Sequence, residues 1–193
     1  MLPTLIILAY LVGSISAAII TCKLLNLPDP RTQGSNNPGA TNVLRIGGKK
    51  AAAIVLLGDG LKGFLPVFIG LQLGLDEQAL ALIALSAFLG HVYPVFFGFK
   101  GGKGVATFIG GLLALNYLIG LGFIATWLFV AKVLKISSLS ALIATLLTPI
   151  YSYFLSQQLT TTYIVSIICL WIFYTHRSNI KRILSGQEGT IKS

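Results

Sequence analysis

The segment FKGGKGVAT, Phe99 to Thr107, places a lysine among glycines between two strongly apolar stretches. Because glycine has no Cβ, backbone N–H groups can approach an anion closely there, and Lys103 adds a point charge. A helix beginning near Gly104 would direct the positive end of its dipole at the same place. The alternative is a tight turn with a surface lysine. We interpret this segment as a phosphate-binding loop made by Gly101, Gly102, Lys103 and Gly104.

The segment Leu27 to Lys50 is a second polar stretch, and its proline, glycine and asparagine content predicts ordered turns rather than a helix. Its arginine can form two parallel hydrogen bonds with a phosphate, and neighbouring side chains offer donors to an anion or a polyol. The alternative is a connecting loop whose asparagines cap helices and whose basic residues touch lipid headgroups. We favour a binding segment with the candidate residues Ser35, Asn37, Thr41, Asn42 and Arg45.

The third polar stretch is THRSNIKR, Thr175 to Arg182. His176 and Asn179 are three residues apart and therefore share one helix face. His176 could act as a base or donate to a phosphate, or it could simply lie at the membrane interface beside basic anchoring residues. His91, in GHVYPVF, also has two possible roles: it could be a catalytic group, or it could be a hydrogen-bonded residue between helices.

A few polar residues fall inside the apolar runs. Ser14 follows a glycine in the first run, where it could permit close helix packing or make a buried hydroxyl contact. Asp59 and Lys62 are three residues apart on one helix. Ionisable residues within membrane spans usually mark functional sites, but opposite charges at this spacing can also pair. We favour a structural pair.

The composition also limits the chemistry. Only 5 of 193 residues are acidic, without the spacing of a metal site, and the sequence has neither a G-x-S-x-G elbow nor a Ser–His–Asp/Glu constellation. We therefore predict no metal, no cofactor and no activated nucleophile, but donors and cations for a ligand rich in negative charge. A net charge of +9 would suggest a nucleic-acid partner in a soluble protein. Here it indicates loops beside an anionic membrane leaflet, and no nucleic acid.

The chain is 55% hydrophobic and 10% charged, whereas soluble domains carry about 25% charged residues. Apolar runs occupy 3–22, 51–75, 79–97, 105–134, 138–156 and 160–176, and a crossing needs about 20 residues. No Lys or Arg precedes the first run, so we expect a retained span rather than a signal peptide. If 105–134 forms two short helices, every basic loop falls on the same side of the membrane, as the positive-inside rule favours.

We therefore predict one all-α integral membrane domain over residues 1–193. It is a bundle of seven transmembrane helices with the N-terminus outside, the C-terminus cytoplasmic and all three polar stretches on the cytoplasmic side.

At these residues the sequence resembles the bacterial acyl-phosphate-dependent glycerol-3-phosphate acyltransferases, which are integral to the membrane. The resemblance covers nearly the whole chain. The sequence differs from the usual family pattern at Ser16, where proline is common, and at Thr175, where arginine is frequent. The motifs that carry it are GSI from Gly13, DPRTQGSNNPGATNVLRIGGKK from Asp29, GDGLKG from Gly58, GHVYPVFFGFKGGKGVAT from Gly90 and HRSNIKRILSG from His176.

The resemblance implies acyl transfer from acyl phosphate to the 1-hydroxyl of sn-glycerol 3-phosphate, giving lysophosphatidic acid and phosphate, the first step of phospholipid synthesis. It implies a multi-pass protein of the bacterial plasma (inner) membrane, partnered by its two substrates and the bilayer, and it suggests association with other phospholipid-synthesis enzymes. We expect catalytic roles for Ser35, Arg45, Lys103 and His176, and substrate binding by Ser14, Asn37, Thr41, Asn42, His91, Gly101, Gly102, Gly104 and Asn179.

The acceptor of the hydroxyl proton stays open among His176, His91 and the donor's own phosphate. Two other classes of protein compete with the enzyme. A transporter for a phosphorylated solute could use the same cations, but its polar groups would be expected near the membrane midplane. A lipid-binding scaffold explains the basic loops but not the glycine-rich donor segments.

Overall fold

The computed structural model describes residues 1–191, whose regular elements are all helical. The helices are α1 (Leu2–Gly13), α2 (Ala17–Leu24), α3 (Ala40–Gln72), α4 (Glu77–Val92), the 3-10 turn η1 (Val95–Phe97), α5 (Val105–Leu115), α6 (Tyr117–Leu134), α7 (Ser137–Leu155), α8 (Leu159–Thr175) and α9 (Arg177–Leu184).

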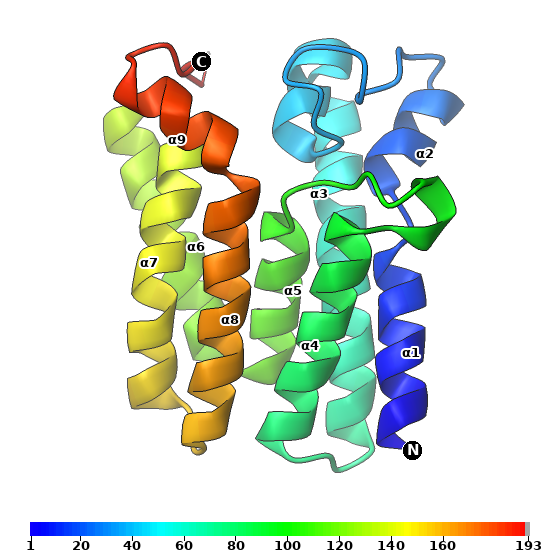
Figure 1. Cartoon of the computed structure of the whole chain (residues 1–193), viewed down its shortest axis with the longest axis vertical. Helices are drawn as coiled ribbons and strands as arrows, with labels where there is room; N and C mark the ends of the chain where they lie inside the picture. Colours follow the sequence, from blue (N-terminus) through cyan, green and yellow to red (C-terminus); the bar gives the residue numbers. More distant parts are fainter. Residues whose placement is uncertain (192–193) are drawn as a thin grey trace.

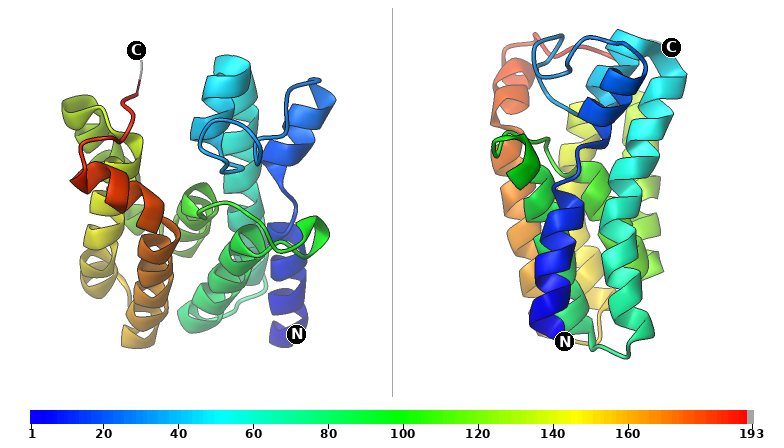
Figure 2. Two further views of the ribbon diagram at one scale, coloured as in Figure 1. Left: turned by 45° about the horizontal axis from the view of Figure 1, so that its top comes forward. Right: turned by 90° about the vertical axis from the view of Figure 1, so that its right-hand side faces the viewer.

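The long helices run side by side, with α9 lying across one end (Figures 1 and 2). The short helix α5 is central, because it packs against α3, α4 and α6. Glycines let α3 and α5 approach closely: a Cβ on Gly63 would meet the Thr107 carbonyl oxygen, and one on Gly110 would meet that of Gly60. Such small-residue contacts are how helices associate in lipid, where burial of apolar surface drives no association.

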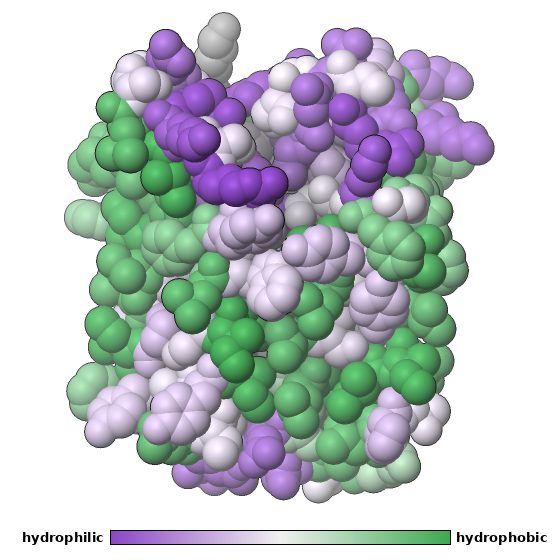
Figure 3. Space-filling model, in the orientation of Figure 1, coloured by the Kyte–Doolittle hydropathy of each residue, from purple (hydrophilic) through white to green (hydrophobic). Residues whose placement is uncertain are grey.

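An apolar belt covers the middle of the bundle, and polar residues gather at its two ends (Figure 3). Five helical segments are long and apolar enough to cross a membrane: Leu2–Leu24, Ala40–Gln72, Glu77–Phe97, Tyr117–Leu134 and Ser137–Leu155. Helices α8 and α9, bent by 59°, make a sixth if they are taken together. Helix α5 has 11 residues, which rise about 16 Å, only half of a hydrocarbon core. The all-helical membrane fold is therefore confirmed, with five to six candidate spans rather than the seven predicted.

The run 105–134 does form two helices, as predicted. Its break lies at Asn116, whose side-chain oxygen accepts a hydrogen bond from the N–H of Leu118 at 3.0 Å and whose amide donates to the Leu155 carbonyl at 3.0 Å. The first run is also interrupted, between α1 and α2. There Ser16 caps α2 by accepting from the N–H of Ile19.

The prediction that Leu27–Lys50 contains no helix is wrong from Ala40 onward, because α3 begins there. The turns rich in proline and asparagine end at Gly39, and Val43 is then fully buried against Ala18 and Val55. Tertiary burial therefore favours a helix in a segment whose composition indicated turns. Within α3, Gly48 has a φ of +76° and kinks the helix, which separates its polar first part from its apolar remainder.

Candidate active site

A cavity of about 890 Å³ lies between the polar end of the bundle and α5. It brings together residues from all three polar stretches, which are far apart in the sequence. Most of the predicted site residues line it: Ser35, Asn37, Thr41, Asn42, Arg45, His91, Lys103, Gly104, His176 and Asn179.

The glycine-rich loop forms one wall of this cavity. The N–H groups of Gly101 and Gly102 donate to the carbonyls of Val92 and His91, each at 3.2 Å, so they hold the loop against α4. A Cβ on Gly104, whose φ is +88°, would meet the ring of Phe88. Within the described chain, the N–H groups of Lys103 and Gly104 make no hydrogen bond. The donors available to an anion are therefore these two and the first turn of α5, rather than the paired glycines.

Lys103 begins a partly buried polar network that reaches the C-terminal tail. Its ammonium donates to Oδ1 of Asn179, and Nδ2 of Asn179 donates to Oε1 of Glu188 at 2.6 Å. The same carboxylate accepts from Ser138 Oγ and from Arg182 Nε, each at 2.6 Å. Because Asn179 accepts from the lysine and donates to the carboxylate, it fixes the direction of the ammonium.

Two pKa values in this network depart from their ordinary values. Burial lowers the pKa of the Lys103 ammonium to about 8; the Glu188 carboxylate opposes this shift, and the charges of Arg182 and Arg45 add to it. Burial raises the pKa of Glu188, but hydrogen bonds from Ser138, Arg182 and Asn179 outweigh it and hold the pKa below its ordinary value.

The kcat/KM for an anionic substrate should therefore fall as the pH passes through about 8, because Lys103 then loses its proton. A phosphate monoester is already a dianion at that pH, since its second pKa is about 6, so the substrate does not titrate there. Steady-state kinetics between pH 7 and 10 measure the effect. Lys103→Arg keeps its charge over this range and should give a flat profile, whereas a flat profile for the unmodified protein would contradict the assignment.

Glu188 should also contribute to stability, because its carboxylate ties the C-terminal tail to Ser138, Asn179 and Arg182. The same tail is held further along by the N–H of Ile191, which donates to the Lys135 carbonyl at 2.7 Å. Removing a buried carboxylate that accepts three hydrogen bonds should cost about 1.5–3 kcal/mol. We expect Glu188→Ala to lower the unfolding midpoint by about 4–10 °C, measured in detergent. Thr190→Ala is the matched control in the same tail, and equal midpoints for the two variants would refute the role.

Asn42 organises the loop that carries Ser35 and Asn37. Its side chain is 1% exposed; its amide donates to the carbonyls of Pro30 and Gln33 at 2.9 Å, and its oxygen accepts from the N–H of Ser35 at 2.9 Å. All of its hydrogen-bonding groups are therefore engaged within the loop. Asn42 therefore holds the backbone of Ser35 in place, and it also lines the cavity.

His176 lines the cavity. Its Nδ1 lies 2.8 Å from the carbonyl oxygen of Ile172, which can only accept, so Nδ1 carries the proton in the neutral ring. Nε2 is then left with a lone pair. His176 and Asn179, which we expected to share a helix face, both line the cavity; His176 lies at the junction of α8 and α9, and Asn179 lies in α9.

Ser14 is not brought to this cavity. It is fully buried, donates to the Tyr10 carbonyl at 2.8 Å and accepts from the N–H of Val95 at 3.3 Å. Thr41 lies at the rim, 3.3 Å from the hydroxyl of Ser137. The predicted pairing of Asp59 with Lys62 is confirmed at 2.8 Å, and Asp59 also borders the cavity.

Sequence reasoning missed several contributors. Glu188, Ser138 and Arg182 join the cavity wall through long-range hydrogen bonds that no local pattern reveals. Thr175, which departs from the usual family residue, donates to the Lys103 carbonyl at 3.2 Å and so ties the loop to α8. The scarcity of acidic residues was the one signal that could have drawn attention to Glu188.

The cavity continues into an apolar groove along α5, between α3 and α6. Its lining includes Leu57 and Leu61 of α3, Leu113 of α5, and Trp127 and Leu128 of α6. Leu57, Leu61 and Leu128 are more than half exposed, so the groove opens sideways onto the apolar belt.

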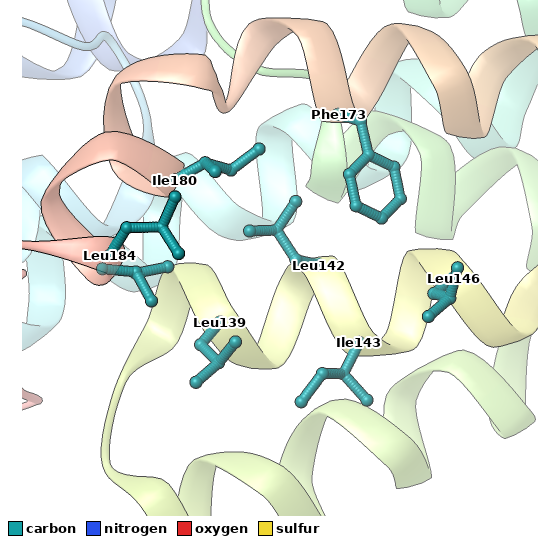
Figure 4. Close-up of a pocket in the computed structure, with 8 residues that line it drawn as sticks. Leu139, Leu142, Ile143, Leu146, Phe173, Ile180 and Leu184 are labelled. Atoms are coloured by element: carbon teal, nitrogen blue, oxygen red, sulfur yellow. The ribbon is translucent and has the colours of Figure 1, made fainter.

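A smaller pocket of about 270 Å³ between α7, α8 and α9 has apolar lining residues, among them Leu142, Phe173 and Ile180 (Figure 4). It offers no charged or hydrogen-bonding side chain to an anion. Among residues 1–191, no group of three or more His, Cys, Asp or Glu is placed to hold a metal ion.

An all-helical membrane bundle whose cation-lined cavity continues into an apolar groove is the architecture expected of a membrane enzyme acting on lipid precursors. Residues 3–186 match the family model described as glycerol-3-phosphate acyltransferase, and the chain belongs to that family. It is an acyltransferase of phospholipid synthesis, integral to the membrane.

Relatives and solved structures agree over nearly the full length. The glycerol-3-phosphate acyltransferase of Ruthia magnifica subsp. Calyptogena magnifica is 68% identical, covering 97% of this chain and 95% of the relative. That of Hydrogenovibrio crunogenus is 54% identical, covering 95% of this chain and 88% of the relative. The crystal structure of PlsY (YgiH), an integral membrane glycerol 3-phosphate acyltransferase, in its glycerol 3-phosphate form superposes with a TM-score of 0.94 at 38% identity, covering 99% and 96%. Its lysophosphatidic acid form gives 0.91 at 38% identity, covering 98% and 94%.

Proposed function

We propose that this enzyme transfers a fatty acyl group from acyl phosphate to the 1-hydroxyl of sn-glycerol 3-phosphate, releasing lysophosphatidic acid and inorganic phosphate. The observation that carries the proposal is the single cavity that joins a cation-lined end to a sideways-opening apolar groove. A lipid-bound acyl phosphate needs both parts at once, since its chain stays among apolar side chains while its phosphate reaches cations. A solved relative is described in a glycerol 3-phosphate form, which supports the acceptor.

The reaction brings together two anions that repel one another, and the cations are distributed accordingly. Lys103, Gly104 and the first turn of α5 would hold the phosphoryl group of the donor. Arg45, with Ser35 and Asn37, would hold the phosphate of glycerol 3-phosphate at the exposed rim. Asn179 keeps the ammonium of Lys103 aligned, and a preorganised donor of this kind is worth about 10²–10³ in rate.

We propose direct transfer without a covalent acyl-enzyme. Acyl phosphate is already activated, so its carbonyl carbon needs positioning and its departing phosphate needs charge stabilisation. Within residues 1–191, none of the cavity-lining serines hydrogen-bonds to a histidine. The hydroxyl of Ser138 donates to Glu188, whose carboxylate is also held by Asn179 and Arg182, that of Ser137 lies against Thr41, and that of Ser35 makes no hydrogen bond. The cavity supplies donors and cations instead.

We also propose that residues 1–193 form one protein domain, which is embedded in the bacterial plasma membrane with its N-terminus outside and its C-terminus in the cytoplasm. Seven helical segments would lie in the membrane if α5 is included. The basic stretches gather at the polar end that carries the cavity, whereas Glu77 lies in the opposite turn, where its carboxylate accepts from Ser156 at 2.9 Å. By the positive-inside rule, this distribution of charge supports a basic end, and with it a site, in the cytoplasm.

The donor is tested by giving purified protein in lipid bilayers glycerol 3-phosphate with acyl phosphate, acyl-CoA or acyl carrier protein in separate reactions. We expect lysophosphatidic acid only from acyl phosphate. Transfer from acyl-CoA or acyl carrier protein at a comparable rate would overturn the donor assignment, while transfer from none of the three would overturn the acyltransferase reaction itself.

A further inference from the structure

The smaller pocket lies away from the active site, between α9 and the ends of α7 and α8 (Figure 4). Its volume is about 270 Å³, and all of its lining side chains are apolar, with Leu142 and Ile143 on α7 and Phe173 on α8. Leu146, which also lines it, is 62% exposed. The pocket therefore opens sideways, and in a membrane its surroundings are acyl chains.

Helix α9 covers this pocket but is not closed onto it. The helix has 8 residues, and isolated helices shorter than about 12 residues are marginal in water, so α9 depends on packing of one face. That face carries Ile180, Ile183 and Leu184, which are three and four residues apart. Leu184 is nevertheless 83% exposed. The fold thus leaves an apolar surface that an apolar group from outside the chain can cover.

Two cations flank this apolar stripe on the side of α9 that faces away from the active site. At about 100° per residue, Arg177 and Lys181 lie on one side of the stripe. Asn179 and Arg182 lie on its other side, where both donate to Glu188 in the cavity wall. Arg177 and Lys181 are exposed, and neither makes an ion pair within residues 1–191. Their charges are therefore available to an anion outside the active site.

Arg177 is anchored at the junction of α8 and α9. Its Nη1 donates to the Tyr174 carbonyl at 3.2 Å, and its guanidinium carbon lies 4.6 Å from the centre of the Tyr174 ring. Exposed tyrosines of membrane proteins gather at the boundary between acyl chains and headgroups, and Tyr174 is exposed. This arrangement holds the guanidinium at the depth of the lipid phosphates.

We infer that the pocket binds an anionic phospholipid of the membrane, with part of one acyl chain beneath α9 and the headgroup phosphate between Arg177 and Lys181. Residues four apart on a helix are neighbours, so both cations reach one phosphate, and the arginine can donate two parallel hydrogen bonds to it. A zwitterionic headgroup would bring its own positive charge to the same cations. The site is separate from the cavity and does not depend on the proposed function.

An occupied pocket steadies the active site from the far side of α9. The acyl chain packs against Ile180 and Leu184, and the same helix carries Asn179, which aligns the ammonium of Lys103. Because a ligand that binds only the packed state of a segment suppresses its opening by mass action, lipid binding should slow the amide hydrogen exchange of α9.

Lipid binding tests the charges directly. Purified protein in detergent is given phosphatidylglycerol or phosphatidylcholine with the same acyl chains, and bound lipid is measured by native mass spectrometry. We expect phosphatidylglycerol to bind at least about tenfold more tightly. Arg177→Gln and Lys181→Gln should each weaken its binding about fivefold. Lys23→Gln is the matched control, since it removes an exposed cation of α2 on the other side of the same end of the bundle (Figure 1), and it should bind normally.

Ile143→Trp tests the place of the acyl chain, because it fills the pocket from α7. It should weaken phosphatidylglycerol binding at least about tenfold, equivalent to the lost burial of about two methylene groups. Ile150→Trp is its matched control, about two turns further along the same face of α7 and outside the pocket. The charge variants leave the pocket intact, so they decide the question if Ile143→Trp does not fold.

Amide hydrogen exchange in bilayer discs gives a second readout, which needs neither acyl phosphate nor glycerol 3-phosphate. Exchange over residues 177–184 should be at least about fivefold slower with phosphatidylglycerol than with phosphatidylcholine, and Lys181→Gln should remove most of this difference. The inference is overturned if the two lipids bind equally, if both charge variants bind like the unmodified protein, or if folded Ile143→Trp and Ile150→Trp bind alike.

Discussion

Lys103→Ala should reduce kcat/KM by about 10²–10³ while leaving the protein folded, because it removes a preorganised cation from the site of developing charge. The loss should appear mainly in kcat, since the ammonium stabilises the departing phosphate more than the bound donor. Initial rates of phosphate release at saturating and limiting acyl phosphate separate the two parameters. Lys103→Arg retains the charge but not the compact geometry, and it should fall between the alanine variant and the unmodified protein.

Lys100→Ala is the matched control for this prediction. Lys100 belongs to the same loop but is exposed and does not line the cavity, so its loss should change kcat/KM less than about twofold. If Lys100→Ala and Lys103→Ala were equally impaired, a general electrostatic effect of the loop would explain both. The assignment of Lys103 to the phosphoryl group would then fail.

Arg45→Ala should reduce kcat/KM by about 10- to 100-fold, equivalent to loss of about 1.5–3 kcal/mol from a charge-assisted hydrogen bond. We expect the loss mainly as a higher KM for glycerol 3-phosphate, because the arginine lies at the rim and binds a phosphate that takes no part in the bond changes. Steady-state titration of glycerol 3-phosphate at fixed acyl phosphate measures it.

Two further variants make this prediction specific. Arg45→Lys keeps the charge but cannot form two parallel hydrogen bonds, so it should recover only part of the affinity. Lys49→Ala removes an exposed charge one turn further along α3 that does not line the cavity, and it should behave like the unmodified protein. A KM for glycerol 3-phosphate that is unchanged in Arg45→Ala would contradict the placement of that phosphate.

The sequence predicts the helices and the site residues unequally well. The break at Asn116 could be predicted because the loops before and after the run 105–134 are both basic, which favours two helices there over one. The pairing of Asp59 with Lys62 could be predicted because the two residues are only three positions apart. The start of α3 at Ala40 could not be predicted, because it depends on the burial of Val43 in the folded protein. Local composition favours the wrong state at that point.

The candidate site shows the same division. The cavity brings together Lys103, Arg45 and Asn179, which charge and motif spacing single out. The amide directions could not be predicted, since the N–H groups of Gly101 and Gly102 turn toward carbonyls of α4. Nor could Glu188, which reaches the site only through hydrogen bonds across the fold.

Rapid-quench measurement of phosphate release tests most directly whether acyl phosphate and glycerol 3-phosphate meet in this cavity and react without a covalent intermediate. Enzyme in stoichiometric amount is mixed with acyl phosphate, with and without glycerol 3-phosphate. Direct transfer predicts no release until the acceptor is added, and then one phosphate for each lysophosphatidic acid. A burst of one phosphate per enzyme without glycerol 3-phosphate would reveal an acyl-enzyme and contradict the account.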